Sequence, residues 1–370
     1  MYDMESQVSL ILETGHVLTQ IDSFASPLTS RAIALGVLTS PDIMADLFQA
    51  RLSAAWPAGL TIGNCRPAVL KRRLGSRQVI AYSLVLLDQR GHQERRIEVV
   101  GKRYADGIEG ARAFRAMRLL WESGFGADSR LRIPEPLGYF PDFKLLVQEK
   151  VRGALMPTQI GRGNGSTHRY LTMAARWVAK LHSHDAIPGA VSPPEDDEIS
   201  IRKFVGCVGE CFPRQAAPLE GIARALRHRR AFFKAPRPTL VHGDFHPENI
   251  FVTRNGATVI DFDQFCLSDP ARDLGYILAQ MQATAYRQTG SFRAVAAEIK
   301  AFLDEYFTSI APEEHDAWAA RIATFAATSL LEGLYYITCV VKDDAFSGSL
   351  LYIQEIHRLI GVERARVFVS

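Results

Sequence analysis

The spacing of apolar residues changes from helical to strand-like after about residue 60. Before that point the chain is expected to be mostly helical, and the clearest helix follows Ser40 and Pro41, which suit a helix cap and first turn. Apolar residues then recur at helical spacing as far as Leu52, and the pattern stops before Pro57. We expect this helix to pack on the next domain; a dimer contact and a lid over a pocket are the alternatives.

A sheet is predicted downstream, because strand-forming residues dominate from Pro67 onwards. The first strand leads into a turn at Gly75, and residues 79–87 form the second strand. Residues 97–104 form a third strand after a turn that ends at Gly91. Three strands joined by short turns predict a small antiparallel sheet.

Helical spacing returns after the sheet. Residues 110–123 carry the apolar stripe of one amphipathic helix, whereas residues 145–153 indicate a strand that runs into a linker. The chain beyond this linker is predicted to be mostly helical. The expected helices lie near residues 170–184, 273–287, 292–308, 313–341 and 347–360.

The 370 residues are enough for two domains, each with its own core. We predict a helical extension at residues 1–60, a sheet domain at 61–152 and a helical domain at 153–370. A hydrophobic share of 47% and a charged share of 22% are typical of a globular protein, and the net charge of +3 is too small to indicate a nucleic-acid partner. The basic run at residues 71–73 is expected to face water; a basic rim beside bound phosphates is the alternative.

Two features bear on the compartment. No stretch reaches the roughly eighteen apolar residues of a membrane span, and the first residues lack the basic start and apolar core of a signal peptide. The five cysteines are scattered, and Cys207 and Cys211 have no second pair at zinc-ligand spacing. We therefore expect a cytoplasmic protein with reduced thiols and no membrane partner.

The most informative polar residues lie between short apolar stretches near residue 250. A run that begins at His242 contains Asp244 and Asn249, and the following strand turn contains Asp261. Phosphoryl transfer from ATP needs a carboxylate that receives the proton of the acceptor hydroxyl, and oxygen ligands that hold Mg²⁺. We predict Asp244 as the catalytic base and Asn249 and Asp261 as the metal ligands.

This order resembles that of kinase catalytic loops, in which an Asp is followed five positions later by an Asn and then by a metal-binding Asp-Phe dipeptide. Gly243 stands where protein kinases have Arg, and Asp263 stands where they have the Gly of Asp-Phe-Gly. These two changes, and the run from Ser268 to Leu274, resemble the aminoglycoside phosphotransferase and choline kinase family of small-molecule kinases. The resemblance extends from about residue 60 to near the end of the chain.

The resemblance implies an α+β, two-lobed protein-kinase-like fold, with a small antiparallel-sheet N-lobe and a mostly helical C-lobe. In this chain the helical N-terminal extension would precede the N-lobe. The acceptor pocket is then expected among the C-terminal helices and the loops between them.

The resemblance also assigns the nucleotide-binding residues. Lys102 corresponds to the strand lysine that contacts the α- and β-phosphates, and the backbone of Glu149 and Val151 corresponds to the segment that binds adenine. Gly75 and Ser76 lie in a turn where backbone amides can approach the phosphates, with an ordinary turn as the alternative. ATP and Mg²⁺ are therefore the expected cofactors.

Kinases pair the strand lysine with a Glu on the next helix. In this chain the helix carries arginines at the positions where that Glu is first expected. Glu109, just before the helix, is therefore the candidate partner. The adjacent Arg103 is the alternative to Lys102 as the phosphate contact.

Five further polar residues are assigned mainly structural roles. His242 is expected to brace the catalytic loop and His246 to be structural, with a phosphate contact as the alternative. Asp273 is expected to accept backbone N–H groups at the start of its helix. His182 and His184 lie on different faces of one helix, which favours packing or capping over a metal pair.

Candidates for the acceptor pocket are acidic or aromatic. An acidic loop at residues 193–198 is expected to be solvated; attraction of a cationic acceptor is the alternative. The other candidates lie on the C-terminal helices: Asp304, Glu305, Glu332, Tyr335, Tyr336, Asp343 and Asp344.

These features predict an ATP- and magnesium-dependent phosphotransferase that moves the γ-phosphate to a hydroxyl group of a small molecule. Amino sugars, sugars and amino-alcohols are the expected acceptors, and this small-molecule acceptor is the expected partner. Gly243 and the absence of an Ala-Pro-Glu segment after Asp263 disfavour an atypical protein kinase. The alternative from another class is a nucleotide-binding regulatory or scaffold protein with a kinase fold and little turnover.

Overall fold

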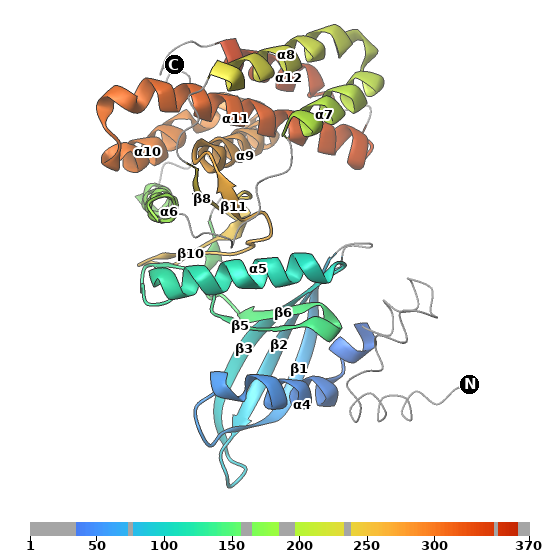
Figure 1. Ribbon diagram of the computed structural model, residues 1–370, viewed down its shortest axis with the longest axis vertical. Helices are drawn as coiled ribbons and strands as arrows, with labels where there is room; N and C mark the ends of the chain where they lie inside the picture. Colours follow the sequence, from blue (N-terminus) through green and yellow to red (C-terminus); the bar gives the residue numbers. More distant parts are fainter. Residues whose placement is uncertain are drawn as a thin grey trace, which may run out of the picture. The chain divides into compact units, whose positions relative to one another are not determined.

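The computed structural model describes residues 35–72, 77–156, 165–184, 197–232, 238–343 and 347–361 (Figure 1). The chain divides into two compact units. The first contains the residues up to Trp121 together with Pro134–Val151. The second contains Glu122–Ile133 and the chain from Arg152 onwards.

The first unit is built on a five-stranded sheet in which every pair of neighbours is antiparallel. The strand order β1-β2-β3-β6-β5 results from a three-stranded meander followed by a hairpin whose second strand pairs with β3. The strands are β1 (Thr61–Arg72), β2 (Arg77–Leu87), β3 (Gln93–Tyr104), β5 (Pro136–Phe140) and β6 (Leu145–Glu149).

The expected start of β1 at Pro67 is wrong, because the strand begins at Thr61. Gly63 and Asn64 are weak strand formers when taken alone. Asn64 nevertheless pairs with Val85 of β2. Gly63 lies at an irregularity between the paired residues Ile62 and Asn64, and a Cβ there would lie 2.1 Å from the side chain of Leu87. The tertiary pairing therefore overrides the local preference.

The helix α4 (Pro41–Leu52) packs on this sheet, as its apolar spacing predicts. The ring of Phe48 meets the ring of Tyr82 edge-on, with centroids 5.0 Å apart. The Tyr82 hydroxyl donates a hydrogen bond to the carbonyl oxygen of Leu38 (3.0 Å), which ties the chain before α4 to β2. The part of the predicted helical extension before residue 35 lies outside the described residues.

The helix after the sheet, α5 (Gly107–Leu120), begins three residues before the predicted start at Gly110. Its cap explains the difference: the carboxylate of Asp106 accepts the backbone N–H of Ile108 (2.9 Å). The helix continues into a wider turn, Trp121–Phe125, that ends where Gly124 adopts a positive φ of 107°. This turn leads the chain from the first unit into the second.

The second unit is mostly helical, and its short strands form two small sheets. The helices are α6 (Gly165–His182), α7 (Asp197–Cys211), α8 (Ala216–Phe232), α9 (Ala271–Thr289), α10 (Ala296–Tyr306), α11 (His315–Tyr335) and α12 (Ser349–Gly361). The sheets have the orders β4-β10-β9-β7 and β11-β8, from β4 (Leu131–Arg132), β7 (Ala154–Leu155), β8 (Thr239–Val241), β9 (Ile250–Val252), β10 (Ala257–Val259) and β11 (Cys266–Ser268).

Residues 122–133 belong to the second unit although they precede the end of the first in sequence. β4 pairs in parallel with β10, and the Trp177 indole N–H on α6 donates to the carbonyl oxygen of Arg132 (2.8 Å). Lys180 donates to the Gly124 carbonyl (3.1 Å) and pairs with the carboxylate of Asp128 (2.8 Å). These bonds attach the segment to α6.

The acidic run at residues 193–198 was expected to be a loop, and this is wrong for its end. α7 begins at Asp197, so the end of the run is helical, and the carboxylate of Glu198 lies in the first turn, where the helix dipole stabilises it. Glu198 pairs with Arg202 one turn later (2.7 Å). The preceding residues of the run lie outside the described residues.

α11 is packed against α9, α12, α7 and α8. The close approach to α9 requires a glycine, because a Cβ at Gly275 would lie 2.5 Å from the Cβ of Phe325. By length and composition alone, the segment His315–Val340 could cross a membrane, contrary to the expectation from the sequence. Of its apolar window, 56% is buried inside the structure, so packing between helices accounts for much of its apolar character.

Candidate active site

The predicted catalytic loop connects β8 to β9 in the second unit. It ends in a single helical turn, Pro247–Asn249. The hairpin of β9 and β10 then brings the chain back beside this turn. The backbone N–H of Ile260 donates to the Asn249 carbonyl oxygen (2.9 Å). Asp261, the next residue, is therefore held next to Asn249.

Gly243 is required by the way this loop packs. Its φ is +80°, a conformation that costs other residues strain. A Cβ at this position would lie only 2.3 Å from the backbone oxygen of Gln264. The Arg that protein kinases carry here would collide with that backbone, so the glycine allows the loop to touch the segment after Asp261.

Asp273, on α9, holds the start of the catalytic loop in place. Its fully buried carboxylate accepts the backbone N–H groups of His242 and Gly243, each at 2.8 Å, and contacts Nε2 of His182 at 3.1 Å. Burial acts to raise the pKa of Asp273, but hydrogen bonding and the charge of His182 outweigh it, so the pKa is lowered.

The role predicted for Asp273 at the start of its own helix is wrong. It does accept backbone N–H groups, but they come from the catalytic loop. The first N–H of α9, that of Ala271, donates instead to Asp269 (2.9 Å). The aspartate that the sequence presents as a cap is thus an anchor between α9 and the loop.

His242 braces the loop, as predicted. Its Nε2 donates to the carbonyl oxygen of Ile260 (3.0 Å), and its Nδ1 accepts the backbone N–H of Asp244 (3.3 Å). This pair of bonds selects the tautomer with the proton on Nε2. The ring also packs against Phe262 at 4.9 Å, so the loop and the strand turn are joined by both polar and apolar contacts.

The predicted pair of histidines on α6 is structural. His182 contacts the hydroxyl of Tyr306 at 2.9 Å and the carboxylate of Asp273. His184 contacts the backbone oxygen of Lys180 at 2.7 Å, close to the end of the helix. Packing and capping, rather than metal binding, explain both residues.

The Asp244 carboxylate is held by neighbours on three sides. Asn249 Nδ2 donates to its Oδ2 (3.2 Å) and to its backbone oxygen (2.9 Å), and the His246 ring lies 3.7 Å from Oδ1. The Tyr276 hydroxyl on α9 is also hydrogen-bonded to it. Burial acts to raise the pKa of Asp244, but His246 and Tyr276 outweigh it and hold the pKa well below its usual value. The group is therefore an ionised acceptor at neutral pH.

Tyr276 was not identified from the sequence. Burial and the nearby charges of Asp244 and Glu332 raise the pKa of its hydroxyl, which keeps it a donor. The signal that could have found it is its position three residues after Asp273 on an otherwise apolar stretch of α9. A tyrosine at such a position buries its ring and needs a partner for its hydroxyl.

Asp261 has an unusual backbone for a residue other than glycine, with a φ of +71°. Left-handed conformations of this kind persist where the surroundings enforce them, and they cluster at functional sites. The enforcing contacts are those of the preceding residue: the Ile260 N–H is bound by Asn249 and its carbonyl by His242. Phe262, the following residue, is buried in the aromatic cluster around Trp177.

The predicted nucleotide-binding residues lie in the first unit. Lys102 is on β3, opposite Leu146 of β6, with its ammonium 5.3 Å from the ring centre of Tyr104. Glu149 ends β6, and its N–H donates to the carbonyl oxygen of Glu135 (2.9 Å).

Val151 is the last residue of the first unit. The candidate partner Glu109 is exposed in the first turn of α5. Gly75 and Ser76 lie outside the described residues. That the nucleotide-binding residues share one cleft with Asp244 stays a prediction.

Three of the acceptor candidates have structural surroundings. Asp304 pairs with Lys300 and Glu305 with Arg176, while the ring of Tyr335 packs at a tilt against that of Phe204 with ring centres 4.8 Å apart. Tyr336 and Asp343 are exposed, and Asp344 lies outside the described residues. Glu332 is the candidate with an electrostatic link to the loop, through Tyr276.

An antiparallel sheet unit and a helical unit, with an Asp, an Asn and a second Asp on adjacent turns, define the two-lobed protein-kinase-like class. The profile of the phosphotransferase enzyme family matches residues 86–319, and the chain belongs to that family. The predicted family, fold class and enzyme class are therefore confirmed. The enzyme class is a phosphotransferase with an alcohol group as acceptor.

Solved structures give the same fold. A choline kinase from Cryptosporidium parvum Iowa II is similar at 11% identity with a TM-score of 0.56, over 86% of this chain and 94% of that one. A spectinomycin phosphotransferase, in complex with ADP and spectinomycin, is similar at 13% identity with a TM-score of 0.54, over 88% and 98%. A choline/ethanolamine kinase family protein from Mesorhizobium loti is similar at 17% identity with a TM-score of 0.52, over 88% and 97%. No curated protein sequence matches.

Proposed function

We propose that this phosphotransferase moves the γ-phosphate of ATP, with Mg²⁺, to a hydroxyl group of a small molecule. An amino sugar, a sugar or an amino-alcohol is the proposed acceptor, since similar structures include a spectinomycin phosphotransferase and choline kinases. The observation that carries the proposal is the carboxylate of Asp244 on the loop, hydrogen-bonded by Asn249 and Tyr276. We also propose that the reaction takes place in the cytoplasm, where its five free cysteines would stay reduced.

Asp244 would accept a hydrogen bond from the acceptor hydroxyl and aim its oxygen at the γ-phosphorus. Because the pKa of Asp244 is lowered, the carboxylate is a weak base before transfer begins. This suits a loose transition state, in which the hydroxyl loses its proton late and positioning contributes most of the catalysis.

The donor set fits Mg²⁺. Asn249 uses its amide nitrogen to bond Asp244, so its amide oxygen is the atom that would bind the ion. Asp261 adds a charged oxygen from the adjacent turn. The described residues contain no cluster of three acidic, His or Cys groups. Mg²⁺ needs only one or two carboxylates besides nucleotide phosphates and water, so Asn249 and Asp261 are sufficient. When bound, the ion would neutralise charge between the β- and γ-phosphates.

The nucleotide would be held by the first unit. Lys102 would contact the α- and β-phosphates, and Gly75 and Ser76 would offer backbone N–H groups to them. Because the N–H of Glu149 is bonded to Glu135, Glu149 would offer its carbonyl oxygen to adenine and Val151 its N–H.

The test combines nucleotide binding and turnover. Mg²⁺-dependent stabilisation by ATP, measured by thermal shift, should be followed by ADP release with at least one member of an acceptor panel. Asp244→Ala should lower transfer about 10²–10⁴-fold and leave ATP binding nearly unchanged. Asp261→Ala should weaken Mg²⁺-dependent nucleotide binding, whereas the exposed Asp304→Ala serves as the matched control for both.

Two results would contradict the proposal. Full transfer by Asp244→Ala would remove the assigned base. Mg²⁺-dependent ATP binding without turnover on any acceptor would favour the alternative, a kinase-fold protein that binds nucleotides for regulation.

A further inference from the structure

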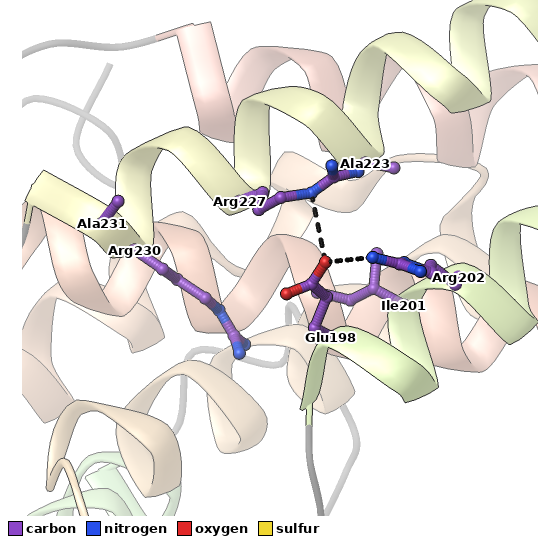
Figure 2. Close-up of a pocket in the computed structure, with 7 residues that line it drawn as sticks. All are labelled: Glu198, Ile201, Arg202, Ala223, Arg227, Arg230 and Ala231. Atoms are coloured by element: carbon purple, nitrogen blue, oxygen red, sulfur yellow. Dashed lines mark hydrogen bonds and ion pairs between the residues drawn. The ribbon is translucent and has the colours of Figure 1, made fainter.

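A pocket of about 400 Å³ lies between α7 and α8 in the second unit (Figure 2). Its size is in the range of small-molecule sites. Three arginines and one glutamate line it together with the aliphatic side chains of Ile201 and two alanines. The wall thus offers both charge and an apolar surface for a carbon skeleton.

The pocket has an excess of positive charge. Glu198 accepts a hydrogen bond from Arg202 (2.7 Å) and faces Arg227 at 3.7 Å, and Arg230 is directed into the same cavity (Figure 2). Among the described residues that line the pocket, three positive charges against one negative leave a net charge of +2. A concave site with this charge attracts anions, and guanidinium groups match the two oxygens of a carboxylate or phosphate.

Arg230 is the best-anchored of these arginines. Its guanidinium lies over the ring of Phe325 at 5.1 Å, and its Nη2 lies 3.4 Å from the hydroxyl of Thr328 on α11. By contrast, the side chains of Arg202 and Arg227 are 69% and 50% exposed, so water screens their charges more strongly. An anion in the pocket would therefore depend most on Arg230.

The pocket is connected to the catalytic loop along α11. Thr328, beside Arg230, precedes Glu332 by one helical turn, about 6 Å along the axis. The charge of Glu332 acts on the hydroxyl of Tyr276, and that hydroxyl is bonded to Asp244. Arg230, Thr328, Glu332, Tyr276 and Asp244 thus form a series of neighbouring groups between the pocket and the catalytic loop.

We propose that this pocket is an anion subsite of the acceptor site, which binds a carboxylate or phosphate at the far end of the acceptor. The inference rests on the proposed function, because the other end of that acceptor would present its hydroxyl to Asp244. It adds a substrate class: acceptors that carry an oxyanion at the end remote from the phosphorylated hydroxyl.

The first experiment measures anion binding without turnover. Inorganic phosphate and, separately, lactobionate, with neutral lactose as the reference, are titrated at low salt in the presence of excess Mg²⁺-ADP, and the melting temperature is recorded. Both anions should stabilise the wild type, and lactose should not. Arg230→Gln should bind the anions about 10–100-fold more weakly, as expected for loss of a charge-assisted hydrogen-bond pair.

Arg224→Gln is the matched control, because Arg224 is an exposed arginine on the same helix that does not line the pocket. It should retain anion binding. Absence of stabilisation in the wild type, or equal anion affinity in Arg230→Gln and Arg224→Gln, would overturn the subsite. A circular dichroism spectrum unchanged in Arg230→Gln would show that the variant folds.

A second experiment separates the subsite from the proposed function. Among acceptors of matched length, those with a terminal carboxylate should have a higher kcat/KM than their neutral counterparts, and Arg230→Gln should remove this preference mainly through KM. Turnover with no preference for the anionic member would overturn the subsite and leave the proposed function intact. No turnover with any acceptor would refute the proposed function, and with it the assignment of the subsite to an acceptor.

Discussion

Asp273→Asn tests whether the catalytic loop is held by a buried carboxylate. The substitution keeps the size of the side chain but removes its charge and one of its two acceptor oxygens. In the structure both oxygens are used, since Oδ1 accepts the N–H of Gly243 and Oδ2 that of His242. The amide NH₂ of the variant would face one of these N–H groups, so two donors would oppose each other in a buried place.

The expected loss of stability follows from these contacts. A hydrogen bond to a charged group contributes about 1.5–3 kcal/mol, and a buried N–H without a partner costs about 1–3 kcal/mol. One charged bond is lost, the other becomes neutral, and the contact with His182 weakens. Together we expect a loss of about 3–5 kcal/mol, which is typical for breaking one partner of a buried charged network. For a unit of this size the melting temperature should fall by about 6–20 °C.

The pH dependence gives a second readout. Because the pKa of Asp273 is lowered on folding, its contribution is fully present above the unfolded value near 3.8 and is lost as pH falls through the lower folded value. The difference in melting temperature between wild type and variant should therefore be largest near neutral pH and narrow below about pH 4. Transfer activity should fall as well, because the loop that carries Asp244 loses its anchor.

Differential scanning calorimetry and transfer assays at the same pH would measure both effects. Asp304→Asn is the control, because it removes an equal charge from an exposed carboxylate that is paired only along its own helix. An Asp273→Asn variant that melts within about 1 °C of wild type, or a difference that does not change with pH, would refute the reasoning.

Two further predictions concern the loop and its surroundings. Gly243→Ala should lower stability by about 1–3 kcal/mol, because its Cβ would meet the backbone of Gln264. It should also reduce phosphoryl transfer more than it reduces nucleotide binding. Gly290→Ala, also at positive φ but in open space, should leave transfer unchanged. Equal transfer by the two variants would contradict this. Asp128→Asn should cost about 1 kcal/mol in urea unfolding at pH 6, because the hydrogen bond and charge of Lys180 overcome burial and lower the pKa of Asp128 to about 2. That difference should shrink as the pH falls from about 4 through about 2, where the wild-type carboxylate becomes protonated, and a constant difference would contradict it.

The sequence predicts the elements with strong local signals. The strand-forming residues at 79–87 and 97–104 became part of β2 and β3. α4 begins at Pro41 after Ser40, as predicted, although the Ser40 side chain makes no capping hydrogen bond. Elements whose conformation depends on distant partners were less predictable. β1 begins at Thr61 because β2 pairs with it on both sides of the irregularity at Gly63. α7 begins inside an acidic run, and the arginines that pair with Glu198 lie on α7 and α8.

The sequence presents the polar residues of the candidate site but not the contacts that support them. The order of Asp244, Asn249 and Asp261 predicts which groups handle the hydroxyl and the metal, and these roles stay predictions. Nothing local indicates that Tyr276 bonds Asp244, or that Asp273 binds the loop rather than its own helix, because both contacts depend on how α9 packs.

Ile260 shows why the three motif residues stay together. Its N–H donates to the carbonyl oxygen of Asn249, and its carbonyl oxygen accepts a hydrogen bond from the ring of His242. These two backbone bonds join the catalytic loop to the strand turn that carries Asp261. The number of residues in the β9–β10 hairpin determines which residue reaches this position. A one-residue insertion in that hairpin would move Asp261 out of place even though all three motif side chains remained. The spacing between Asn249 and Asp261 is therefore a structural requirement of the site, and the side chains alone are not sufficient.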